Sequence, residues 1–279
     1  MRVVGLNNEM YISSAALLEN GRIVAAAAEE RFSRQKHTRD FPVRALEWCL
    51  KSAGCAPSDV GAFAVHWNPG AYLGGFNPLI SSRRRFKAEY LYSVPDYLSS
   101  LFGRRPADHV EQRLVFPDAE ARIFYIDHHC AHIANAYYLS PFQDAAVLTA
   151  DGQGERDATT YSVCRDGEIR LLKRTRYPQS LGLLYSSITE YLGFRPNSDE
   201  WKVMALGAFA DTPGSFDEHF MTLIRELPEG LFEIDLTYFS GYNWDEPGTF
   251  TSKLEELLGP ARRPDDPIED RHYGIAAAL

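Results

Sequence analysis

Long apolar runs are absent from this sequence. No stretch approaches the roughly 20 apolar residues that a transmembrane helix needs, and the N-terminus M-R-V-V-G-L-N-N becomes polar too early for a signal peptide. Cysteine is also scarce, and its spacing matches neither a metal-binding pattern nor a disulfide framework. We therefore expect a cytoplasmic protein with reduced thiols and no membrane partner. The cysteines are Cys49, Cys55, Cys130 and Cys164.

The sequence also lacks an excess of positive charge. Its 29 lysines and arginines face 38 aspartates and glutamates, which gives a net charge of -9 and an isoelectric point near 5.4. An acidic protein repels the phosphates of nucleic acids, so we expect no nucleic-acid partner and favour small soluble ones. With 279 residues, 45% of them hydrophobic, the chain can bury one large core or two moderate ones.

Hydrophobic patterning in the first part of the chain predicts the element order β-β-β-α-β. Asn20-Gly21 between two apolar runs is the strongest short hairpin signal that a sequence offers. Pro42 is expected to begin a helix that carries Trp48 on its apolar face. The expected elements are strands Val3–Leu6, Ser14–Leu18, Arg22–Ala28 and Gly61–His66 and a helix from Pro42 to Leu50.

The pattern breaks up between Trp67 and Pro117, which we interpret as an insertion with short helices, whose W-N-P-G start is a turn. In the second part, Ser180 and Gly182 are interpreted as a helix cap and a close packing contact rather than catalytic groups. The other expected features are strands Arg122–Ile126 and Ala145–Ala150, a hinge at Pro141, a hairpin at Arg165-Asp166-Gly167, and helices Leu181–Tyr191, Phe216–Leu227, Ser252–Leu258 and Pro267–Leu279.

The run D-H-H-C-A-H contains the clearest chemical signal. His128 and His132 are four residues apart, so on a helix they lie on one face and can bind one metal ion. Asp151 follows an apolar strand and offers a carboxylate. Two histidines and one carboxylate with open positions suit Fe(II), with Zn and Mn as rivals. The alternative for the histidine pair alone is packing and hydrogen bonding.

Other residues fit an anionic ligand. Gly152 and Gly154 flank Gln153 after the predicted strand, where bare amides can approach a phosphate, although this turn alone is also typical of plain turns. Lys36 lies in a cationic run that either binds an anion or faces water. Lys202 is either a nucleotide contact or a cation at a helix start.

In order along the chain, several motifs resemble the N-terminal part of the NodU/CmcH-type O-carbamoyltransferases. The resemblance covers nearly the whole chain, and the motifs are specific only in combination. They are V-V-G-L-N, S-S-A-A-L-L-E-N-G-R-I-V-A-A-A-A-E-E-R-F-S-R-Q-K-H, F-P, H-H-C-A-H, D-G-Q-G-E, S-L-G-L-L-Y-S and K-V-M-A-L-G.

The resemblance implies an α/β fold of the actin, sugar-kinase and heat-shock-chaperone type, with two RNase H-like lobes. Residues 1–141 would form the first lobe, with a helical insertion near 67–117. Residues 142–279 would begin a second, truncated lobe. A C-terminal YrdC-like domain, which relatives have, would be absent and would have to come from a missing half or a second chain.

The resemblance also implies a reaction. Carbamoyl phosphate and ATP, with Mg, would yield carbamoyl-adenylate, and this part of the enzyme would transfer the carbamoyl group to a hydroxyl of a small-molecule acceptor. His128, His132 and Asp151 would hold the metal, Asp151 and Lys36 would be catalytic, and Lys36 would contact the intermediate. No covalent enzyme intermediate is then required.

Two features depart from the family pattern. Tyr11-Ile12 stands where many relatives carry His-Asp, and the chain has roughly half the usual family length. The fragment alone is therefore expected to be inactive in the complete carbamoylation cycle. The alternatives are a non-catalytic nucleotide- and metal-binding subunit and a subunit of the tRNA threonylcarbamoylation type, which the acidic balance disfavours.

Overall fold

The structure is a computed structural model that describes residues 1–8, 12–68, 109–117, 119–241 and 248–279. The described chain divides into two compact units. The first contains the described residues of Met1–Phe76 and Ala88–Ala131, and the second contains those of His132–Leu279. The division falls inside helix α4 (His128–Tyr138), which is continuous across it.

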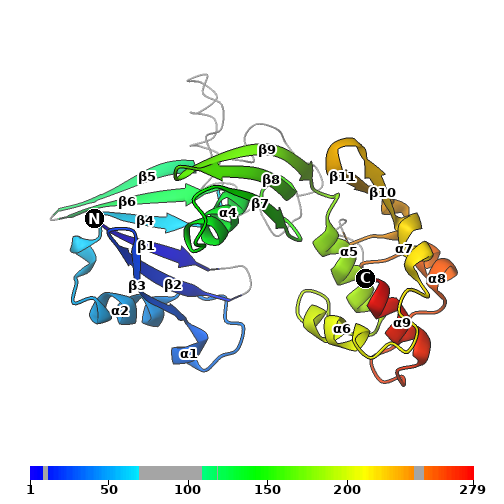
Figure 1. Ribbon diagram of the computed structural model, residues 1–279. Helices are drawn as coiled ribbons and strands as arrows, with labels where there is room; N and C mark the ends of the chain where they lie inside the picture. Colours follow the sequence, from blue (N-terminus) through cyan, green and yellow to red (C-terminus); the bar gives the residue numbers. More distant parts are fainter. Residues whose placement is uncertain (9–11, 69–108, 118, 242–247) are drawn as a thin grey trace. The chain divides into compact units, whose positions relative to one another are not determined.

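A six-stranded mixed sheet forms the first unit, in the order β3-β2-β1-β4-β6-β5 (Figure 1). The first three strands form an antiparallel meander, whereas β4 pairs parallel with both β1 and β6. The carboxyl ends of β1, β4 and β6 therefore lie at one edge of the sheet. The strands are β1 (Arg2–Asn7), β2 (Ser14–Glu19), β3 (Arg22–Ala28), β4 (Ala62–Val65), β5 (His109–Phe116) and β6 (Ala119–Ile126).

The β2–β3 hairpin confirms the turn predicted at Asn20-Gly21. Both residues have positive φ, 50° and 80°, as the tight two-residue hairpin turn requires. An asparagine and a glycine tolerate this left-handed backbone at little cost. The sequence signal was therefore sufficient to place this hairpin.

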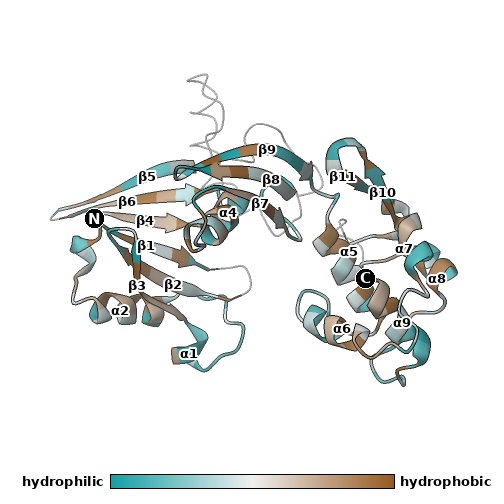
Figure 2. Ribbon diagram, in the orientation of Figure 1, coloured by the Kyte–Doolittle hydropathy of each residue, from teal (hydrophilic) through white to brown (hydrophobic). Residues whose placement is uncertain are grey.

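Two helices, α1 (Glu30–Ser33) and α2 (Val43–Ser52), follow the meander, and α2 packs on β2 and β3. The buried Glu29 carboxylate accepts a hydrogen bond from the Ala45 amide and so satisfies a donor in the first turn of α2. The residues after α1 are polar, shown teal in Figure 2. The core contains Val4, Ala15, Leu17, Ala25, Ala45, Cys49, Leu50 and Val60.

Trp48 does not lie on the buried face of α2, so that prediction was wrong. Its side chain is 42% exposed and its ring lies 6.0 Å from that of Phe32. Cys49 and Leu50 take the buried positions instead. In a short helix, two apolar faces that differ by a rotation of one residue fit the sequence almost equally well. Packing against the sheet decides which of these two faces is buried.

The second unit contains another antiparallel meander, which follows α4: β7 (Ala145–Ala150), β8 (Asp157–Arg165) and β9 (Glu168–Arg176). The β8–β9 turn has Asp166 and Gly167 at positive φ, which confirms the predicted hairpin. Helix α4 covers this sheet through Ile133 and Tyr137, which pack with Val147 and Cys164. This packing sets the position of α4 relative to the end of β7.

A helical subdomain follows the meander within the second unit. Its largest buried cluster contains Tyr191, Val203, Leu223, Leu254 and Ile275. The helices are α5 (Leu181–Tyr191), α6 (Glu200–Gly207), α7 (Asp217–Leu223), α8 (Ser252–Leu258) and α9 (Asp270–Ala278); the short hairpin is β10 (Ile224–Leu227) and β11 (Leu231–Ile234); and η1 (Pro57–Asp59), η5 (Pro228–Gly230) and η6 (Leu236–Tyr238) are 3-10 turns.

Two predicted elements differ from the observed ones. The helix predicted for Phe216–Leu227 ends at Leu223, and its last four residues form β10, which pairs with β11. Most of the insertion predicted for 67–117 falls on residues 69–108, outside the described part of the chain, while its end forms strand β5. Non-local pairing decides both cases, which a local pattern does not encode.

The mixed α/β fold predicted from the sequence is confirmed. Each unit contains a three-stranded antiparallel meander that precedes a helix, and in the first unit parallel strands β4 and β6 extend the sheet, as in an RNase H-like lobe. Across the described ranges, no helix combines the length and apolar character needed to cross a bilayer.

The start of α9 makes stability depend on pH. His272 Nδ1 accepts a hydrogen bond from the Glu269 amide at 2.8 Å, and burial lowers the pKa of this imidazole. His272 in the unfolded chain therefore binds a proton more readily than in the folded chain. Its contribution to stability is fully present above about pH 6.5, the ordinary histidine pKa, and is lost as the pH decreases through the lower folded pKa.

We expect His272→Gln to reduce this loss of stability on acidification, because glutamine at the same helical position accepts the amide hydrogen bond without titrating. Thermal unfolding between pH 5 and 8 tests this prediction. The wild type should lose about 1 kcal/mol, the contribution of one such hydrogen bond, more than the variant does. Parallel pH profiles would contradict it.

Candidate metal centre

Helix α4 presents both predicted histidines on one face. It begins directly after β6, and the Asp127 carbonyl accepts a hydrogen bond from the Ala131 amide at 2.9 Å, closing the first turn. His128 and His132 are one turn apart, so their imidazoles project from the same side. This confirms the helix predicted for the D-H-H-C-A-H run.

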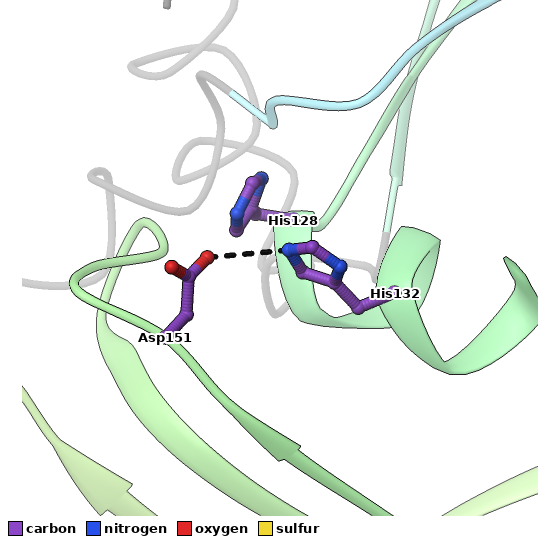
Figure 3. A group of neighbouring side chains, drawn as sticks. All are labelled: His128, His132 and Asp151. Carbon is purple, nitrogen blue, oxygen red and sulfur yellow. Dashed lines mark hydrogen bonds and ion pairs between the residues drawn. The ribbon is translucent and has the colours of Figure 1, made fainter. Parts of the chain in front are cut away.

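Asp151 lies directly after β7, where its backbone is still paired with β8 through the hydrogen bond from its amide to Ala158. One carboxylate oxygen, Oδ1, accepts a hydrogen bond from the Gly152 amide at 2.6 Å. The other oxygen, Oδ2, lies 3.2 Å from His132 Nε2 (Figure 3). The carboxylate is thus oriented by its own turn toward the helix.

His128, His132 and Asp151 form a group that can hold a metal ion. One ligand atom of each lies within 4.8 Å of the others (Figure 3). Metal–ligand bonds of about 2.1 Å hold neighbouring ligand atoms about 3.0 to 3.4 Å apart, and the contact between His132 and Asp151 already has this length. The donor set therefore fits a divalent ion with small adjustments.

The group is buried on one side and open on the other. His128 is 8% exposed, whereas the side chains of His132 and Asp151 are 48% and 35% exposed. Three protein ligands leave positions for water or substrate, which distinguishes catalytic from structural sites. Two imidazoles and one carboxylate suit Fe(II), Zn or Mn. Cys130, between the histidines, is half-buried and does not belong to the group.

The N-terminus of α5 holds the backbone at Asp151. Ser180, which is fully buried, donates from its hydroxyl to the Asp151 carbonyl at 2.7 Å and accepts from the Leu183 amide at 3.1 Å. A Cβ on Gly182 would lie 2.4 Å from the Gly152 amide nitrogen, so only glycine permits this approach. The predicted cap and close packing contact are both confirmed, and both act on the turn that carries Asp151.

The glycine-rich turn uses its amides internally. Gly152 donates to the Asp151 carboxylate, and Gly154 donates to the Asp157 carbonyl at 2.8 Å. Glu155, the next residue, is 4% exposed. In this arrangement the turn orients the carboxylate, and the two glycines predicted to bind cofactor make these hydrogen bonds within the protein.

The two predicted cationic residues lie on other segments of the chain. Lys36 is exposed on the segment after α1 in the first unit. Lys202 lies on α6 in the second unit, where its Nζ is 3.0 Å from Asp199 Oδ1 and 5.5 Å from the centre of the Trp201 ring. The lysine lowers the pKa of the Asp199 carboxyl.

Two aromatic neighbours of His128 were not predicted from the sequence. The rings of His66 and Trp67 lie 5.4 Å and 5.5 Å from the His128 ring. These residues follow β4, which pairs parallel with the strand before His128. The position of His66 and Trp67 directly after a strand is a usable signal, because residues that follow neighbouring parallel strands meet at one edge of the sheet. Using this signal requires knowing that β4 and β6 are neighbours.

A comparison with models of known protein families identifies the family of this chain. The model of the family described as "Carbamoyltransferase N-terminus" matches residues 2–253. The chain belongs to this carbamoyltransferase family. The resemblance to carbamoyltransferases noted in the sequence is thereby confirmed.

Curated relatives of this family member are longer than the chain. An uncharacterized protein of Synechocystis is 32% identical over 293 residues, which span 99% of this chain and 45% of that protein. The nodulation protein NolNO of Sinorhizobium fredii is 27% identical, over 98% of this chain and 37% of its own length. The chain thus spans less than half the length of these relatives.

Similar solved structures include YeaZ from Pseudomonas aeruginosa, which is 18% identical with a TM-score of 0.31 and matches 64% of this chain and 67% of that one. A Ppx/GppA family protein of Aquifex aeolicus is 13% identical with a TM-score of 0.31, and the match covers 99% of this chain and 87% of that chain.

We expect Gly182→Ala to destabilise the protein and to displace Asp151, because the nearest atoms to the new Cβ are backbone atoms that cannot rotate away. Such overpacking costs about 1–3 kcal/mol. Thermal unfolding measures the effect. Gly5→Ala is the control, since its added Cβ has its nearest neighbour 3.9 Å away; equal melting temperatures for the two variants would contradict the prediction.

Proposed function

We propose that this carbamoyltransferase family member is the transfer part of a larger, metal-assisted enzyme. It would receive carbamoyl-adenylate, made from carbamoyl phosphate and ATP, and transfer the carbamoyl group to a hydroxyl of a small-molecule acceptor. The observation that carries the proposal is the cluster of His128, His132 and Asp151 in a chain that belongs to this family.

The donor set supports metal assistance rather than covalent catalysis. The described residues around Asp151 offer imidazole nitrogens and a carboxylate within reach of one ion, and the partial exposure of His132 and Asp151 leaves room for a substrate oxygen. A bound divalent ion would polarise the carbamoyl carbonyl and stabilise the charge that develops on its oxygen. His128, His132 and Asp151 would hold that ion.

The proposed reaction is a direct transfer that needs no carbamoyl group bound covalently to the enzyme. The acceptor oxygen forms a bond to the carbamoyl carbon, and the bond from that carbon to the adenylate phosphate oxygen breaks. AMP leaves with the electron pair, and the hydroxyl proton passes to solvent. The role of the chain is to orient the carbonyl and to keep the carboxylate of Asp151 in place through the Gly152 amide and the Ser180 hydroxyl.

Two lysines would take part in binding the intermediate and the nucleotide. Lys36 is exposed and would meet the anionic intermediate through its ammonium group. Lys202 would contribute to the nucleotide only after leaving its ion pair with Asp199. A segment outside these residues, or a second chain, would supply the adenylate, since the chain spans less than half the length of its curated relatives.

Metal binding by the chain tests the proposed site directly. We expect the 279-residue chain to bind one equivalent of Fe(II) under anaerobic conditions, and His132→Ala to abolish stoichiometric binding, because two remaining ligands hold an ion poorly. Elemental analysis after gel filtration measures this. His219→Ala is the matched control, since His219 lies on α7 outside the group; metal content unchanged by His132→Ala would refute the assignment.

Transfer itself is tested with synthetic carbamoyl-adenylate and water or a simple alcohol as acceptor, by AMP release. We expect release to depend on added Fe(II) and to fall about 10²-fold or more in Asp151→Asn, comparable to loss of one oxyanion-stabilising group. Metal binding without AMP release would retain the metal site but reject the transfer reaction. Metal-independent release would reject metal assistance.

A further inference from the structure

A three-residue segment after β4 lies against the first histidine of α4. β4 and β6 are neighbouring parallel strands, with Val65 opposite Tyr125 in the register. Because both strands end at the same edge, the residues that follow them, His66 to Asn68 and Asp127 to His128, come together. All of these residues belong to the first unit.

Asn68 holds Asp127, the residue directly before α4. Its side chain is 0% exposed, and its Nδ2 donates to Asp127 Oδ1 at 2.6 Å. The Asp127 carbonyl in turn closes the first turn of α4 by accepting from Ala131. A buried amide is costly unless it is hydrogen-bonded, so this pairing strongly specifies where Asp127 and the adjacent His128 lie.

Two rings restrict the imidazole itself. The His66 and Trp67 rings lie against the His128 ring at angles of 60° and 57°, and His128 is 8% exposed. Close packing on a ring limits the rotamers that it can adopt. His132, on the next turn, is more accessible, since its side chain is 48% exposed.

We propose that Asn68 is a positioning residue for His128: through Asp127 it orients the buried imidazole toward the metal position, and Trp67 and His66 keep the ring there. The proposal rests on the proposed metal-binding function of His128. His128 would then be a ligand oriented before the metal binds, whereas His132 and Asp151 are more accessible. Partners that orient a ligand typically change metal affinity by about 10- to 100-fold when they are removed.

An exchange of the two polar residues tests the hydrogen bond. Asn68→Asp sets two carboxylates against each other, whereas Asn68→Asp with Asp127→Asn restores one amide and one carboxylate with the donor on the other side. We expect the single variant to bind Zn(II) at least about tenfold more weakly than the wild type. The exchange should restore most of that loss. Competition with a chromophoric chelator measures the dissociation constants.

Two controls separate positioning from general damage. Ser187→Ala removes another buried hydrogen bond, to the Thr249 carbonyl, and should leave the Zn(II) affinity unchanged. In a His128→Ala background, Asn68→Asp should cause no further loss, since the two residues act as one unit. Equal affinity in Asn68→Asp and wild type, or additive losses in the double variant, would overturn the proposal.

A metal-free measurement keeps the proposal apart from the proposed function. The Cε1 proton of His128 is assigned by comparison with His128→Ala in the NMR spectrum of the apoprotein. We expect its chemical shift to move in Asn68→Asp and to return in the exchange variant, because the ring moves relative to Trp67. An unmoved signal overturns the positioning role, whereas failure of wild-type protein to bind Zn(II), Fe(II) or Mn(II) rejects the metal site alone.

Discussion

The hydrogen bond from the Ser180 hydroxyl to the Asp151 carbonyl is the constraint on which the candidate metal centre depends. A carboxylate at the end of a strand is useful only if its backbone does not move. Ser180 achieves this from the N-cap of α5, a helix whose Leu184 and Ile188 are buried in the main core of the second unit. Gly182 then admits the turn at a distance that any side chain would prevent. The stability of the helical core is thereby transmitted to a single carboxylate.

The three candidate ligands differ in how strongly they are restrained, and this difference suits catalysis. His128 is enclosed by aromatic rings, while His132 and Asp151 face outward and contact each other at 3.2 Å. A fully enclosed centre would exclude substrate, and a fully exposed one would lose conformational entropy each time it formed. Combining one prepared imidazole with two accessible ligands avoids both costs.

Local signals predicted much of the fold. The Asn20-Gly21 and Asp166-Gly167 turns, the Ser180 cap and the helix that carries His128 and His132 all followed from residues a few positions apart, because each depends on backbone preferences or side chains in the same segment. The failures share a different cause. Trp48 was assigned to the wrong face of α2, and residues 224–227 pair as strand β10 instead of continuing a helix. Both outcomes depend on partners distant in the chain.

By itself, the sequence determined the residue types of the candidate centre, their spacing on α4 and after β7, and the family to which the chain belongs. Only the tertiary structure decided that His132 and Asp151 meet, that the amides of Gly152 and Gly154 turn inward, and that Asn68 reaches Asp127. The physical reason is that spacing along one helix is a property of the local backbone. Convergence of residues from different strands instead depends on strand order and on packing between elements, neither of which appears in any short stretch of sequence.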